Sequence, residues 1–233
     1  MISVIPYATL GHVDHGWLNA HHHFSFASYH NEKRMSFGVL RVVNDDAIKA
    51  GAGFDMHPHK DMEIITFVRK GAITHRDSNG NKGKTSAGDV QVMSAGSGIY
   101  HSEFNLESED TQLYQIWIYP KEKGIKPRWD QKKISTEPLN GKLHLLVSGR
   151  EKDQDKGALY IHQDAAIYGG RINKGQQIKY KIVDQVYLLV SKGEIRIAEK
   201  LLTAGDGAEI VNEQEISIYA NKDTELVLLD VPN

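Results

Sequence analysis

The feature that most constrains this chain is a pattern of turns that occurs twice. The segment Phe67–Gly71 resembles Leu189–Gly193, and Ser86–Asp89 resembles Thr203–Asp206. The two matches occur in the same order, and the interval between them is five residues shorter in the second copy. This arrangement predicts an internal duplication of one structural unit. The alternative is that Gly-Asp turns recur by chance, because such turns are common in β proteins.

Short apolar runs separated by turn residues fill both halves of the chain, and long helical periodicity is missing almost everywhere. The expected strands are Glu63–Val68, Ala72–Arg76 and Asp89–Met93 in the first half, and Tyr187–Ser191, Glu194–Ile197, Glu209–Val211, Ile216–Tyr219 and Leu226–Leu229 in the second. The pair Asn79-Gly80 predicts a hairpin with a type I′ turn, in which both central residues have positive φ. We therefore predict an all-β fold with one β-barrel in each half.

The chain of 233 residues is long enough for two domains. Lys, Pro, Gly and Asn cluster between Lys121 and Gly141, which is typical of a linker. We expect an N-terminal metal-binding barrel over residues 1–125 and a second barrel over residues 140–233, packed against the first.

Composition excludes several classes of site. Cysteine is absent, so disulfides, thiolate metal sites and a cysteine nucleophile are excluded, and any metal must bind nitrogen and oxygen atoms. The formal net charge of −2 gives no overall field that would attract nucleic acid or an anionic membrane. Neither a leader-like N-terminus nor an apolar stretch of transmembrane length is present. The expected location is cytoplasmic.

Two pairs of possible metal ligands have the spacing of residues on one face of a strand. One residue separates His57 from His59, and one separates His101 from Glu103. Side chains at positions i and i+2 of a strand project from the same face. Three imidazoles and a carboxylate can bind a divalent metal and leave positions open for water or substrate. One His-X-His pair alone is often an ordinary polar strand face, and the second pair favours a metal site.

Glycines surround both pairs with the spacing of the two cupin motifs. The first motif comprises Gly51, His57, His59 and Glu63, and the second comprises Gly96, Gly98, His101 and Asn105, with a glycine in place of the usual proline. Glycine permits the tight turns that bring two ligand strands together at the mouth of a barrel. The pattern therefore indicates a cupin barrel.

Longer segments resemble the pirin family, and specifically the bacterial pirin-like bicupins with reported quercetin 2,3-dioxygenase activity. The resembling segments are Gly53–Phe54, His57–Ile64, His75–Gly80 and Met93–Glu103, with further matches at His23–Ala27, Arg41–Asp46 and Tyr114–Ile118. The similarity is strongest from about Gly11 to Pro120. It implies a bicupin fold made of two packed cupin barrels.

The resemblance also implies the ligands, because three His and one Glu of the family match His57, His59, His101 and Glu103. It implies iron, as Fe(II), or another divalent metal, and Mn, Co, Ni, Cu and Zn suit the same donors. Cupins more widely use the carboxylate of the first motif, here Glu63, which strand alternation places on the face of His57 and His59. We favour Glu103 as the ligand and interpret Glu63 as a buried residue that orients the imidazoles.

The other histidines are not predicted as ligands. The run His21–His23 is assigned a structural or solvated role. The second half has no His-X-His pair at the equivalent place, so we expect its barrel to be degenerate and without metal. Phe26, Phe54 and Ile116 adjoin the motifs and are candidates for an apolar slot for a flat substrate, although such residues are more often core.

The activity implied by the resemblance is that of an oxidoreductase in flavonoid degradation, which opens the flavonol ring with O2 and releases carbon monoxide. The flavonol would bind the metal through its 3-hydroxyl and 4-carbonyl oxygens, and Glu103 would act as the catalytic general base. Two alternatives remain. The protein could be a non-enzymatic, metal-dependent regulatory protein, as eukaryotic pirins are, or a cupin enzyme acting on a different chelating substrate. Protein partners are not identified by the sequence.

Overall fold

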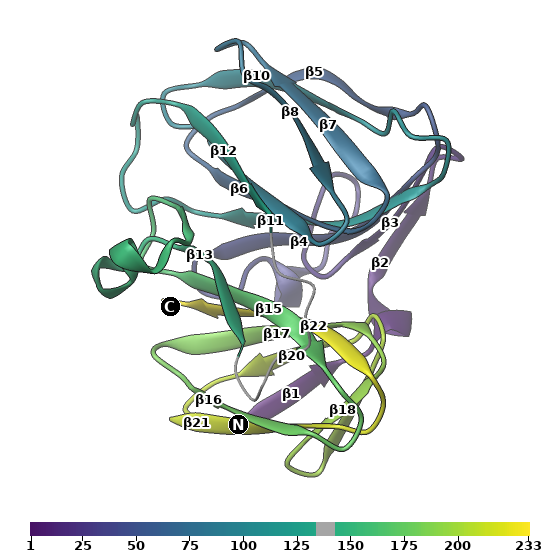
Figure 1. Cartoon of the computed structure of the whole chain (residues 1–233), viewed down its shortest axis with the longest axis vertical. Coiled ribbons are helices and arrows are strands. Elements are labelled where there is room, and N and C mark those ends of the chain that lie inside the picture. Colours follow the sequence, from purple (N-terminus) through teal and green to yellow (C-terminus); the bar gives the residue numbers. More distant parts are fainter. Residues whose placement is uncertain (134–142) are drawn as a thin grey trace. The chain divides into compact units, whose positions relative to one another are not determined.

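The computed structural model describes residues 1–133 and 143–233, which form two compact units (Figure 1). The N-terminal unit contains residues 11–133 and 159–163. The C-terminal unit contains residues 1–10, 143–158 and 164–233. Both units are built almost entirely from antiparallel strands, and the helices among the described residues are short 3-10 turns, none of them long and apolar enough to span a membrane.

The N-terminal unit consists of two antiparallel sheets. Its strands are β2 (Gly11–Asp14), β3 (Leu18–His22), β4 (Leu40–Ile48), β5 (Gly53–His59), β6 (Glu63–Lys70), β7 (Ala72–Asp77), β8 (Lys82–Ser86), β9 (Asp89–Ser94), β10 (Ile99–Phe104), β11 (Thr111–Ile118), β12 (Arg128–Lys133) and the two-residue β14 (Leu159–Tyr160), and it contains the 3-10 helix η2 (Glu32–Arg34). One sheet has the order β12-β9-β6-β11-β4-β3-β2, and the other has the order β5-β10-β7-β8.

The C-terminal unit has two sheets of corresponding order. Its elements are β1 (Ile2–Ile5), η1 (Tyr7–Thr9), β13 (His144–Ser148), η3 (Glu151–Lys156), β15 (Ala166–Ile172), β16 (Gln177–Lys181), β17 (Gln185–Lys192), β18 (Glu194–Ile197), β19 (Lys200–Thr203), β20 (Gly207–Ile210), β21 (Glu215–Ala220) and β22 (Thr224–Val231). One sheet contains β1-β20-β17-β22-β15-β13, and the other has the order β16-β21-β18-β19.

The repeated turns of the sequence occupy equivalent places in the two units. Gly71 joins β6 to β7 and Gly193 joins β17 to β18, with φ angles of 72° and 87°. Gly88 and Gly205 precede β9 and β20, and their φ angles are also positive. These left-handed conformations favour glycine, which explains why the turns retain it. The all-β prediction of two cupin-type barrels is confirmed.

The unit boundaries differ from those expected from the sequence. Residues 1–10 belong to the C-terminal unit, because β1 pairs with β20 and places Ile2 opposite Ile210. The expected linker contains β12, which pairs with β9 from Arg128 to Lys133. β1 and β12 are both edge strands, so the unit to which each belongs depends on a partner strand far away in the sequence. Residues 134–141 of the expected linker lie outside the described residues.

The hairpin at Asn79-Gly80 is present, but its turn is longer than predicted. β7 and β8 pair from Ala72 opposite Ser86 to Arg76 opposite Lys82, so the loop does not have two residues. Gly80 has a φ of 88°, whereas Asn79 is not in the left-handed region. The type I′ prediction was therefore wrong. Asp77 stabilises the loop instead, because its Oδ1 accepts hydrogen bonds from the backbone N–H groups of Asn79 and Asn81.

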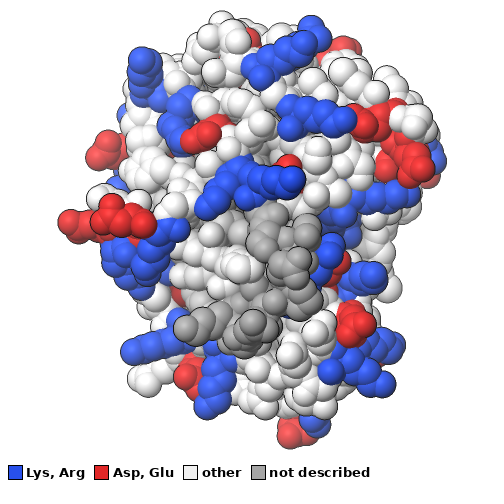
Figure 2. All heavy atoms as spheres, viewed as in Figure 1, with Lys and Arg blue, Asp and Glu red and all other residues white. Residues whose placement is uncertain are grey.

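Charged side chains are distributed without obvious segregation on the face drawn in Figure 2, where basic and acidic groups are interspersed. The interiors of the two units differ more. The C-terminal unit encloses one large apolar cluster that includes Leu188, Ile197 and Leu228. Buried polar residues of the N-terminal unit include Thr66, His75, Gln91, His101 and Glu103, which lie on four different strands.

Candidate metal centre

Three histidines from two adjacent strands meet in the N-terminal unit. His57 on β5 lies directly opposite His101 on β10, and His59 lies two residues beyond His57 on the same strand. The ring centroids are 4.5 Å apart for His57 and His101, 4.8 Å for His57 and His59, and 4.9 Å for His59 and His101. One ring nitrogen of each lies within 4.8 Å of the others. The cluster has the dimensions of a metal site.

The unprotonated nitrogens of this cluster are available to a ligand. The Nδ1 of His57 lies 2.6 Å from the carbonyl oxygen of Asp55, which can only accept, so Nδ1 carries a proton and the neutral ring has its bare nitrogen at Nε2. The Nε2 atoms of His59 and His101 are buried without a hydrogen-bond partner. Burial, followed by the neighbouring histidines, lowers the pKa of both His59 and His101 to about 3. Buried, neutral imidazoles with unpartnered nitrogens fit a divalent transition metal.

Glu103 adjoins the cluster through His101, and its carboxylate is held by the opposite sheet. Its Oε1 accepts hydrogen bonds from Gln91 Nε2 at 2.6 Å and Thr66 Oγ1 at 3.2 Å, and its Oε2 accepts one from Gln115 Nε2 at 2.8 Å. The structure groups Glu103 with His75 and His101 within 4.8 Å, in a second set that overlaps the three histidines at His101.

Sequence reasoning missed the three residues that hold Glu103. Thr66 lies opposite both Gln91 and Gln115 in the sheet register, so the three form one polar row across β9, β6 and β11. Each is a polar residue with an apolar or aromatic residue on either side in the sequence, and this was the available signal. A buried polar group needs a partner, so such a row indicates a shared acceptor.

Glu63 does not lie where strand alternation placed it. β5 ends at His59 and β6 begins at Glu63, with Asp61 in a left-handed conformation between them, so the two segments belong to different sheets. Alternation applies only within one continuous strand. Glu63 is fully buried, and its Oε2 accepts a hydrogen bond from Ser94 Oγ at 2.7 Å. Burial raises the pKa of its carboxyl.

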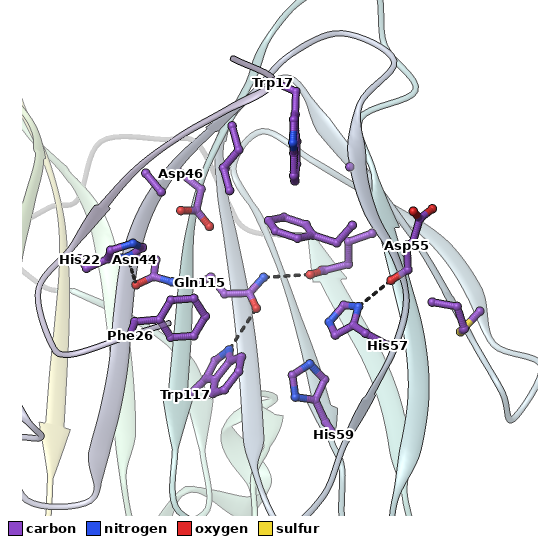
Figure 3. A pocket seen from close by; sticks show the side chains of 16 residues that line it. Trp17, His22, Phe26, Asn44, Asp46, Asp55, His57, His59, Gln115 and Trp117 are labelled. Carbon is purple, nitrogen blue, oxygen red and sulfur yellow. Dashed lines mark hydrogen bonds between the residues drawn. The ribbon is translucent and has the colours of Figure 1, made fainter. Parts of the chain in front are cut away.

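A pocket of about 510 Å³ opens beside the cluster (Figure 3). Its lining residues include Trp17, Phe26, Phe54, His57, His59, Glu103, Gln115 and Trp117. Trp17 packs edge-on against Phe54 at 5.2 Å, and Phe26 packs edge-on against Trp117 at 5.4 Å. The expectation that Phe26 and Phe54 line a slot agrees with this arrangement. The same expectation for Ile116 was wrong. Its neighbours on β11, Gln115 and Trp117, face the pocket, whereas the Ile116 side chain is buried in the core.

Across the pocket from His57 and His59 lies a polar group formed by His22, Asn44 and Asp46 (Figure 3). His22 Nδ1 lies 2.8 Å from Asn44 Oδ1. Burial, followed by the charges of Asp45 and Glu103, raises the pKa of Asp46 to about 8, and its Oδ1 has no hydrogen-bond partner. The raised pKa favours the protonated carboxyl, which can donate a hydrogen bond.

The run His21–His23 has more than one role. His23 is buried, and burial lowers its pKa to about 3. His21 stacks on His12 with ring centroids 4.4 Å apart. These two agree with a structural assignment, whereas His22 lines the pocket, which the sequence did not reveal.

Two family models match the chain. The model described as Pirin matches residues 5–118, and the model described as Quercetinase C-terminal cupin domain matches residues 145–231. The two matches correspond to the two barrels.

Relatives match over nearly the whole chain. A putative quercetin 2,3-dioxygenase of Zymomonas mobilis is 51% identical over 98% of this chain and 97% of its own length. The quercetin 2,3-dioxygenase of Escherichia coli K12 is 46% identical over 95% of both chains. The crystal structure of the bacterial pirin YhhW from Escherichia coli in complex with nickel(II) matches with a TM-score of 0.92 and 43% identity, over 100% of this chain and 99% of that one.

Proposed function

The chain belongs to the pirin family, and from this premise we propose that it is a metal-dependent dioxygenase that opens the ring of a flavonol such as quercetin with O2 and releases carbon monoxide. The observation that carries the proposal is the cluster of unpartnered imidazole nitrogens in the wall of an aromatic pocket. Relatives named quercetin 2,3-dioxygenase support the choice of substrate class.

His57, His59, His101 and Glu103 would hold the metal, which we propose to be Fe(II). When bound, a divalent metal supplies a Lewis acid that acidifies the flavonol 3-hydroxyl. The contribution of the three histidines is a set of neutral nitrogens that meet at one place without competing hydrogen bonds.

The pocket suits a flat, uncharged ligand. Its volume of about 510 Å³ lies in the usual range for small-molecule sites. Trp17, Phe54 and Trp117 supply aromatic surface that excludes water from the bound ring. Among the described residues that line the pocket there is no lysine or arginine, which disfavours an anionic substrate. Asp46, whose carboxyl has a raised pKa, would orient a phenolic hydroxyl or carbonyl at the far end.

Glu103 is the proposed general base. Its carboxylate lines the pocket, and hydrogen bonds from Gln91 and Gln115 fix its position. From there it would accept the proton of the 3-hydroxyl, leaving an electron-rich flavonolate for attack by O2.

The test is anaerobic reconstitution with Fe(II), followed by oxygen uptake and loss of quercetin absorbance. The wild type is compared with His57→Ala and Glu103→Ala, and with His30→Ala as a control at an exposed histidine. Turnover that is lost in the first two variants and kept in the control supports the proposal. Tight metal binding by the wild type without turnover of any flavonol contradicts it and favours the metal-dependent regulatory role.

A further inference from the structure

We propose that Asp77 and His75 are positioning residues that fix the tautomer of His101, so that its Nε2 stays unprotonated and available to the metal. This inference rests on the proposed role of His101 as a metal ligand. It assigns a purpose to two buried polar residues that the proposed reaction itself does not use.

The three side chains form a continuous chain of hydrogen bonds. His75 and Asp77 lie on β7, and His101 lies opposite Asp77 on the neighbouring strand β10. The Nε2 of His75 is 3.1 Å from Asp77 Oδ2, and the Nδ1 of His75 is 3.4 Å from the Nδ1 of His101. The side chains of His75 and Asp77 are fully buried, so water does not complete these bonds.

Asp77 can act only as an acceptor in this chain. Its Oδ1 accepts from the backbone N–H groups of Asn79 and Asn81, and its Oδ2 accepts from Asn81 Nδ2 at 2.9 Å as well as facing His75. A carboxyl that accepts from three donors is an ionised carboxylate without a proton to give. The Nε2 of His75 must therefore carry the proton of its bond to Asp77.

The remaining protons follow from valence. When His75 and His101 are both neutral, each ring carries one N–H, so a His75 that is protonated at Nε2 has a bare Nδ1. The bond between the two Nδ1 atoms needs one proton, which must come from His101. The single proton of His101 then lies on Nδ1 and its Nε2 is bare, in agreement with the buried Nε2 that has no partner.

Packing holds the His75 ring in this orientation. It stacks on Trp129 with centroids 5.0 Å apart and an interplanar angle of 9°. His57 reaches the same tautomer by a simpler route, because the carbonyl oxygen of Asp55 accepts from its Nδ1. Two of the proposed ligands thus present Nε2 because a neighbouring acceptor holds the proton on Nδ1, which is how outer residues commonly orient metal-binding histidines.

The most direct test needs no substitution. In metal-free full-length protein labelled with ¹⁵N-histidine, long-range ¹H–¹⁵N spectra distinguish the two neutral tautomers. We expect His101 in the Nδ1–H form and His75 in the Nε2–H form. A His101 that carries its proton on Nε2 would overturn the proposal.

Asp77→Asn tests the consequence for metal binding. The amide oxygen can keep the bonds from the backbone N–H groups of Asn79 and Asn81, and the bond from Asn81 Nδ2 is lost. The new NH2 group donates to His75 Nε2, which moves the His75 proton to Nδ1 and the His101 proton to Nε2. Nickel(II) affinity, measured by chelator competition, should fall about 10- to 100-fold. Unchanged affinity in a variant with the same melting temperature as the wild type would refute the proposal.

Two further variants separate the relay from the fold. His75→Phe keeps an aromatic ring against Trp129 but removes the acceptor, and it should also weaken nickel binding. Asn81→Ala removes the side-chain donor to Asp77 Oδ2 and keeps the backbone N–H that donates to Oδ1, so it should retain the wild-type tautomer and affinity. The tautomer and the nickel(II) affinity are both measured without flavonol turnover. The predicted tautomer in a protein that does not turn over flavonols would therefore contradict the proposed function and leave this inference intact.

Discussion

The N-terminal and C-terminal units can be aligned residue by residue through a contact that occurs in both. Gly71 lies against Thr111 in the first unit, and Gly193 lies against Thr224 in the second. Each threonine Oγ1 accepts a hydrogen bond from the backbone N–H that follows the glycine, at 3.2 Å in both units. This shared turn provides a common origin for comparing the two interiors.

At the positions of His101 and Glu103 the C-terminal unit has isoleucine, and at the position of His57 it has tyrosine. His75 lies four residues after Gly71 and pairs with Glu103, whereas Ile197 lies four residues after Gly193 and pairs with Ile218. His101 lies two residues before Glu103 and pairs with His57. In the same way, Ile216 lies two residues before Ile218 and pairs with Tyr180.

The residues that hold Glu103 are replaced in the same way. Thr66, Gln91 and Gln115 form a row of register partners in the N-terminal unit. The corresponding row in the C-terminal unit is Leu188, Ala208 and Leu228. A carboxylate and its three donors have therefore been exchanged together for apolar residues.

The C-terminal unit also buries charge, in a network of hydrogen bonds around Asp230. Asp230 accepts hydrogen bonds from Arg150 at 2.7 Å, Tyr180 at 2.7 Å, and the backbone N–H groups of Val183 and Asp184. Unpartnered buried polar atoms occur in both units, Arg150 Nη1 among them, but in the N-terminal unit the Nε2 atoms of His59 and His101 belong to one cluster of three histidines. An unpartnered buried polar group costs stability, so a cluster of such nitrogens is better explained by a ligand than by packing alone.

The largest effect expected from this difference is on metal affinity. His101→Ala should reduce nickel(II) affinity by well over 100-fold, because loss of a ligand exceeds the effect of losing an outer partner. Its matched control is Ile216→Ala at the equivalent position. That variant should lower the free energy of unfolding by about 2–5 kcal/mol and leave nickel binding unchanged. Calorimetric titration of both variants checks this, and impaired binding by the control would break the comparison.

Introducing a carboxyl into the C-terminal core should have the next largest effect. Ile218 is the equivalent of Glu103, but it has no counterpart of the three donors that hold the Glu103 carboxylate. Ile218→Glu therefore buries an uncompensated charge, and we expect the free energy of unfolding to fall by about 3–5 kcal/mol. Adding Leu228→Gln should recover part of the loss, because Gln115 donates to Glu103 from the matching position. Urea denaturation of the single and double variants measures the recovery, and strict additivity would count against the alignment.

The N-terminal unit should also lose stability in acid through His23. Burial lowers the folded-state pKa of His23 to about 3 from an ordinary value of 6.5. Between these values the unfolded chain binds the proton and the folded chain does not, so folding loses up to about 1.4 kcal/mol per pH unit as the pH falls from 6.5 towards 3.

This acid sensitivity can be followed in one unit. All three tryptophans, Trp17, Trp117 and Trp129, lie in the N-terminal unit, so their fluorescence reports on it. The pH slope of its unfolding free energy should be smaller in His23→Leu, and should not change in His30→Leu at an exposed histidine. Parallel slopes for wild type and His23→Leu would show that His23 is already protonated in the folded state.

The smallest predicted effect concerns the pocket wall. Trp17→Ala should raise the KM for quercetin about threefold to tenfold with little change in kcat, because an aromatic contact contributes about 0.5–1.5 kcal/mol to binding. Steady-state kinetics with metal-loaded protein provides the measurement. A large fall in kcat with constant KM would mean that Trp17 acts in the reaction and not only in binding.

Much of this arrangement could be predicted from local sequence. The eight expected strands, the repeated turns and the ligand pairs depend on residues close together in the chain. What sequence could not provide depends on pairing across sheets. β1 finds its partner β20 at the other end of the chain, Glu63 falls on a different sheet from His59, and Asp77 meets His101 only through the register of β7 and β10.

The central claim is that one unit of the pair carries the metal. The most direct measurement is an anomalous difference map from crystals of the nickel(II)-loaded protein. The account predicts one strong peak within coordination distance of the Nε2 atoms of His57, His59 and His101 and the carboxylate of Glu103. A peak coordinated by His75, or one in the C-terminal unit, would contradict it.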